Sequence, residues 1–199
     1  RELNSAISRI KMRYAHTDYQ HQEIEDGAIG TTFTNKGSEG SVELGHAKLG
    51  DLDGVWGWQF QNSRFAALGE EAFVPTVQTK SHAAYLYEEM PLKALGLDQL
   101  KLSLGGRAEH TALDASAWAK NPTVQAADFT TYSYALGGLY AIDSHWSMAS
   151  NLSHNERAPS YFELYADGAH LATGQYEVGN PNFKKERSNG VDAQIRWKD

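Results

Sequence analysis

Strict alternation of apolar and polar residues constrains the fold of this chain more than any other feature. Between residues 100 and 110, Leu100, Leu102 and Leu104 occupy alternate positions, and polar or small residues fill the positions between them. Because successive side chains of a β-strand point to opposite faces, this pattern predicts strands with one apolar and one polar face. The same period recurs at residues 8–14, 55–61, 131–142, 146–152 and 189–197.

The alternation predicts an all-β chain with long strands. Several of them exceed the usual length of about five or six residues. Only PSYFELYADG, residues 159–168, could hold a turn or two of helix. We expect eight strands, near residues 2–16, 33–49, 54–64, 76–89, 99–112, 129–142, 145–155 and 186–198.

The connections between these strands alternate in length, which favours a membrane barrel over a soluble β-sandwich. Short turns that alternate with long external loops are typical of outer-membrane barrels. The polar faces also carry charged residues, which a dry sandwich core could not hold unpaired. We therefore expect an antiparallel transmembrane β-barrel, either closed by eight strands or as an arc of a larger barrel. Long connections are expected at 17–32, 65–75, 113–128 and 156–185, and shorter ones at 50–53, 90–98 and 143–144.

Composition excludes several functional classes. The chain has 18 basic and 25 acidic residues, a net charge of −7, which argues against a nucleic-acid partner because phosphates select basic surfaces. It contains no cysteine, so disulfides and thiolate metal sites are impossible. No nucleophile elbow or catalytic dyad is recognisable, so we expect neither an enzyme nor a catalytic cofactor.

Two short boxes near the C-terminus resemble the late barrel of TonB-dependent outer-membrane receptors. The first is Arg157-Ala158-Pro159, and the second is Asn180-Pro181-Asn182-Phe183, followed by Lys185-Glu186-Arg187. In that family the first box ends a strand, a large external loop follows, and an Asn-Pro-x-Leu box leads into the next strand. Phe183 stands where leucine is more usual.

The resemblance implies an architecture larger than this chain. Such receptors have 22 strands and an N-terminal plug, and they lie in the outer membrane of Gram-negative bacteria. Residues 1–199 would then be part of the barrel domain, an arc of about eight strands, with the plug absent. The implied partners are outer-membrane lipid and, through the missing plug, the energising TonB complex.

The stretch HTDYQHQEIEDG, residues 16–27, resembles the subgroup that imports zinc. Zinc takes imidazole nitrogen and carboxylate oxygen. In extended chain, His16 projects with Asp18, and His21 projects with Glu23. His16 shares the parity of the lipid side, however, and each histidine could equally be a solvated loop residue. The residues of this stretch that match the subgroup are Asp18, Tyr19, His21 and Glu23, with Phe33, Asn35 and Gly37 beyond it.

His170 lies between the two boxes, where haem receptors of the family carry a histidine. It could ligate zinc or haem iron, or neither, with Tyr165 and Tyr176 as the substrate-binding residues beside it. Siderophore import and a passive pore or small structural barrel are further alternatives. The abundance of carboxylates favours energy-coupled import of zinc, as a transported ligand and not a cofactor. Its predicted metal ligands are His16, Asp18, His21, Glu23 and His170.

Overall fold

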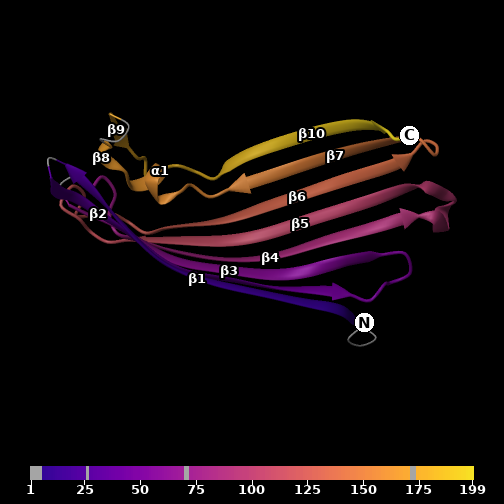
Figure 1. The fold of residues 1–199 in the computed structure, drawn as a ribbon, viewed down its shortest axis with the longest axis horizontal. Helices are drawn as coiled ribbons and strands as arrows, with labels where there is room; N and C mark the ends of the chain where they lie inside the picture. The colour runs from indigo at the N-terminus through magenta and orange to yellow at the C-terminus, as the bar shows by residue number, and fades with distance from the viewer. Residues whose placement is uncertain (1–5, 26, 70–71, 171–173) are drawn as a thin grey trace.

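The computed structural model describes residues 6–25, 27–69, 72–170 and 174–199, which form one antiparallel eight-stranded sheet with a small hairpin at one end (Figure 1). None of the helices in these ranges has the length and apolar character needed to cross a bilayer. The strands of the sheet are β1 (Ile7–Glu25), β2 (Ala28–His46), β3 (Asp53–Gly69), β4 (Val77–Leu92), β5 (Leu97–Ala115), β6 (Ala127–Ala141), β7 (Trp146–Arg157) and β10 (Glu186–Trp197). The smaller elements are η1 (Lys93–Leu95), α1 (Tyr161–Tyr165), β8 (Asp167–His170) and β9 (Gln175–Val178).

The sheet is open. Its strands follow the order β1-β2-β3-β4-β5-β6-β7-β10, and no pairing joins β1 to β10 within the described ranges. Of the two expected arrangements, the arc of a larger barrel is therefore confirmed, and the closed eight-stranded barrel is wrong. The start of β1 and the end of β10 lie at one end of the sheet, here called the turn end, whereas α1, β8 and β9 lie at the other, the loop end (Figure 1).

All eight predicted strands are present, but the expected long loop at 17–32 is wrong. β1 continues to Glu25 and β2 begins at Ala28, with paired residues up to the turn. Polar cross-strand pairs replace the loop, as where Lys36 Nζ donates to Asp18 Oδ2 at 2.9 Å. Gly27 allows the tight turn because its φ of 81° suits glycine and strains other residues. The later connections are short between β4 and β5 and between β6 and β7, and long between β5 and β6 and between β7 and β10, as expected. The connection between β3 and β4 is much shorter than the expected 65–75, because β3 continues to Gly69.

The pairing register defines two faces of the sheet, because directly opposed residues in antiparallel strands project to the same side. On the apolar face, Met12, Val42 and Trp58 lie in one row. The next row belongs to the polar face and begins with Arg13 and Ser41. Met12 is 70% exposed and Trp58 45% exposed, so this apolar face is uncovered.

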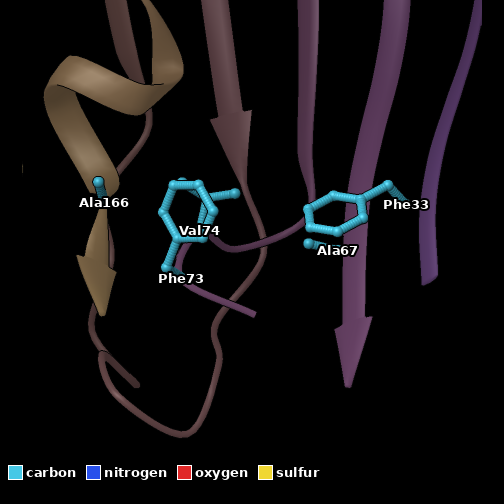
Figure 2. Close-up of a cluster of buried hydrophobic side chains, with 5 residues drawn as sticks. All are labelled: Phe33, Ala67, Phe73, Val74 and Ala166. Atoms are coloured by element: carbon cyan, nitrogen blue, oxygen red, sulfur yellow. The ribbon is translucent and has the colours of Figure 1, made fainter. Parts of the chain in front are cut away.

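The two clusters of buried hydrophobic side chains lie at the loop end, where α1 and residues 72–76 lie over the polar face. In Figure 2, Phe33 and Ala67 of the sheet lie on one side of one cluster, and Phe73, Val74 and Ala166 lie on the other. Helix α1 is short, but Ser160 starts it with a complete capping box. The Ser160 hydroxyl accepts from the backbone of Glu163, and the Glu163 side chain accepts from the backbone of Ser160.

Candidate ligand-capture site

His16 and Asp18 lie on the apolar face of β1, beyond Met12 and Tyr14. His16 Nδ1 is 2.9 Å from Ser38 Oγ, and the Asp18 carboxylate is paired with Lys36. Both side chains are thus engaged with β2, across the strand pair. Neither points over the polar face of the sheet.

His21 and Glu23 lie on the polar face of the same strand. The His21 ring stacks on Phe33, with ring centroids 4.7 Å apart and an interplanar angle of 7°. Since the backbone of β1 separates this pair from His16 and Asp18, the four side chains do not converge. Within the described ranges, no three His, Asp or Glu side chains come together in a way that could hold a metal ion.

His170 forms a close pair with a residue that the sequence did not single out. Its Nδ1 lies 2.8 Å from Glu177 Oε1, across the hairpin of β8 and β9. Its ring stacks on Phe73 with centroids 4.8 Å apart. Glu177 could not be found from spacing alone, because seven residues separate it from His170 and only the hairpin brings the two together.

The two tyrosines predicted to contact substrate differ in environment. Tyr176 is 65% exposed, and its hydroxyl donates to Asp167 Oδ1 at 2.9 Å, which raises the pKa of Tyr176. Tyr165 is 7% exposed and packs with Leu164 and Val77 in the core. Its hydroxyl has no hydrogen-bond partner among the described residues, and burial raises its pKa. Tyr165 is therefore a packing residue in this conformation.

A row of rings links the two predicted histidine positions along the loop end. His21 stacks on Phe33 at one end, and His170 stacks on Phe73 at the other. Phe65 and Phe162 join them, with centroid separations of 6.3, 5.6 and 5.8 Å between successive phenylalanines. Because four phenylalanine rings separate the two imidazoles, His21 and His170 belong to two separate candidate contacts.

The two boxes meet at the base of the long connection between β7 and β10. Arg157 donates to Glu163 of α1 at 2.8 Å and to Glu186 of β10 at 2.7 Å. On the adjoining residue, Glu156 accepts from Lys185 at 2.5 Å and from Arg187 at 2.9 Å. The charged residues of the boxes therefore fasten the connection to the strands on either side.

A comparison with protein families agrees with this architecture. The family model described as "TonB dependent receptor-like, beta-barrel" matches residues 3–199. The chain belongs to this family. TonB-dependent receptors are transporters of the outer membrane of Gram-negative bacteria, and not an enzyme family. The prediction of a barrel arc from such a receptor is thereby confirmed.

Membership of the TonB-dependent receptor family assigns the two faces and the two ends. The apolar face contacts lipid, the polar face lines the lumen, and the loop end with its longer connections is external. Polar side chains continue along the lumen below the candidate contacts. Arg107 donates to Glu109 at 2.9 Å and to Gln59 at 3.1 Å. Gln194 is also on this face, opposite Ala149 of β7.

Proposed function

We propose that this arc belongs to a TonB-dependent receptor that imports zinc, and that external His–Glu pairs make the first contacts with the ion. The observation that carries the proposal is the His170–Glu177 pair, with Nδ1 and Oε1 2.8 Å apart. Imidazole nitrogen and carboxylate oxygen are ligands that zinc prefers. His21 and Glu23, on the lumen side of β1, supply the same two ligand types.

A site with only two protein ligands, such as each His–Glu pair, is better suited to transient capture of zinc than to its long-term retention. Structural zinc sites are closed by four protein ligands. A pair leaves positions for water or for ligands from the plug, so an ion held there can be passed inward. The polar lumen residues Arg107, Glu109 and Gln194 would line its route, and TonB-driven movement of the plug would admit it to the periplasm.

The two tyrosines near His170 support zinc over haem. A haem site built on His170 would use one of them as a second contact, but the Tyr165 hydroxyl is buried among Leu164 and Val77, and the exposed Tyr176 hydroxyl already donates to Asp167. The neighbouring donors are carboxylates, Glu177 and Asp167, and these suit a divalent cation. Haem and iron chelates remain the comparison ligands in the experiment.

Calorimetric titration of the full-length receptor with Zn²⁺ and with haem tests the proposal. We expect zinc binding that weakens about tenfold or more in His170→Ala/Glu177→Gln, because removal of metal-site residues commonly costs that much. His21→Ala/Glu23→Gln should weaken it as well. The matched control is His16→Ala/Asp18→Asn on the apolar face, which should leave zinc affinity unchanged.

Three results would contradict the assignment. Tight haem binding without zinc binding would show that haem, and not zinc, is the transported ligand. Zinc affinity that is unchanged in both His170→Ala/Glu177→Gln and His21→Ala/Glu23→Gln would show that these residues do not bind zinc. Loss of zinc affinity in the control would show that His16 and Asp18 bind zinc, as the sequence analysis predicts. That prediction stands until the variant is measured.

A further inference from the structure

Four strands carry a histidine on the lipid-facing side of the sheet, and the histidines of β1, β4 and β5 lie near one boundary. Towards the turn end of the boundary the face is apolar, with Trp58 and Phe60 on β3, and beyond it the side chains are polar or charged, such as Asn62 and Arg64. This change from aromatic to charged residues is typical of the level of lipid headgroups. The four histidines are His16 on β1, His82 on β4, His110 on β5 and His154 on β7.

The centre of this boundary carries a basic patch, defined here as Arg64, Lys80, His82 and His110. His82 lies directly opposite His110 in the pairing of β4 with β5. Lys80 is two residues further out on the same strand, and Arg64 lies one row beyond it on β3. All four side chains are exposed on the apolar face. The His82 ring rests on Trp58, with centroids 5.8 Å apart and an interplanar angle of 15°.

The positive charges of the basic patch are not neutralised within the described part of the chain. Neither Arg64 nor Lys80 makes an ion pair or side-chain hydrogen bond there, in contrast to Lys36, which pairs with Asp18. The acidic positions next to the patch on this face are Asp114, opposite Gln78, and Asp128, opposite Ala112. The patch therefore presents two cationic groups and two imidazoles to a partner outside the chain.

We propose that the basic patch binds the phosphate of a lipid in the outer leaflet of the membrane. Lys80 and Arg64 supply charge-assisted donors for phosphate oxygens, and His82 and His110 supply further ring N–H groups. The neighbouring surface accommodates the acyl chains, because Ala84 and Ala108 lie opposite each other next to Trp58 in the adjoining apolar row. An apolar track that ends at unpaired cations matches a lipid better than a soluble anion.

Native mass spectrometry of the full-length receptor in detergent, titrated with phosphatidic acid, tests the proposal. We expect retention of this lipid to fall about 25-fold in Arg64→Gln/Lys80→Gln, since each basic residue near an anionic lipid surface contributes about a factor of five. The control Arg196→Gln/Lys198→Gln removes the same charge at the turn end and should leave retention unchanged. Arg64→Lys/Lys80→Arg should retain most of the binding.

Three further measurements keep the outcome decisive. Diacylglycerol, which lacks the phosphate, should bind equally to all variants, and the variants should keep the wild-type melting temperature within about 2 °C because the substitutions are exposed. Equal loss of phosphatidic acid in the turn-end control would overturn the proposal. So would displacement of the lipid by millimolar inorganic phosphate, because the patch would then be a site for a soluble anion.

Discussion

Arg157 connects three parts of the chain at the base of the external connection between β7 and β10. Its guanidinium donates to Glu163 at 2.8 Å and to Glu186 at 2.7 Å. Arginine can engage two carboxylates at once because its donors lie in a planar fork. The side chain is 54% exposed, so solvent screens the pairs and each contributes modestly to stability. The arginine of the first box thus positions α1 over the lumen.

Replacing Arg157 by lysine should loosen α1. Lysine offers a single ammonium group and cannot maintain both pairs in the same geometry. We expect amide exchange in residues 161–166 to accelerate about fivefold, equivalent to about 1 kcal/mol for an exposed pair. Hydrogen exchange of the full-length receptor measures this, with Arg196→Lys at the turn end as control. Unchanged exchange at α1 would show that the core alone holds the helix.

Acid should release the same contact. Hydrogen bonds from Arg157, and then from the Ser160 backbone, lower the pKa of Glu163 to about 2. A carboxyl group whose pKa is lower in the folded state stabilises that state above its ordinary pKa of about 4.3, and the contribution is lost as the pH falls towards the lowered value. After correction for intrinsic rates, exchange at 161–166 should therefore accelerate between about pH 4.3 and pH 2. Glu163→Gln should remove this pH dependence, and a wild-type-like profile in that variant would assign the effect to another group.

At the scale of elements, the strands could be predicted because the two-residue period is a local property. The alternation of Leu100, Leu102 and Leu104 is enough to predict that they share one face, and the rest of the chain is not needed. The extension of β1 and β2 was missed because residues 17–32 have the polar composition of a loop. One signal was available: Asp-Gly at 26–27 favours a two-residue hairpin turn.

The candidate site was less predictable because it depends on contacts between elements. The parity of His21 and Glu23 was readable from the sequence, and so was the opposite parity of His16. The His170–Glu177 pair depends on the hairpin of β8 and β9, and the burial of Tyr165 depends on the packing of α1 on β4 and β5. Neither the hairpin nor the packing of α1 leaves a periodic signal in the sequence.

Phe73 should control the position of the hairpin. It is 4% exposed and packs against both Phe162 and His170. Phe73→Ala removes most of these contacts, and a fully buried phenylalanine is worth about 3–5 kcal/mol. We expect hydrogen exchange in residues 167–170 and 175–178 to rise towards that of an open loop. Phe183→Ala, at a residue 48% exposed, is the control and should leave the hairpin protected.

At the scale of the whole molecule, the two edges of the sheet determine how this arc behaves alone. β1 and β10 each present one unpaired side within the described ranges. Unpaired backbone groups in hydrocarbon are costly, which is why membrane strands close into barrels.

The 199-residue chain should therefore self-associate through its edges in detergent. Light scattering coupled to size exclusion should show multimers, whereas the full-length receptor should remain a single closed species. A monodisperse monomer of the arc would contradict this expectation and would require that β1 and β10 close on each other.

The hairpin of β1 and β2 has a kinetic consequence. Its ladder continues to the turn at Gly27. If His21 and Glu23 make the proposed contact with the ion, the hairpin therefore holds them in place before the ion arrives, and no ordering is needed on binding. Encounter at this hairpin should then proceed at a rate set by diffusion and local charge. The hairpin that carries His170 is only four residue pairs long, so residence there should follow its slower opening and closing. The receptor would thus bind the ion quickly at the β1–β2 hairpin and release it more slowly at the β8–β9 hairpin.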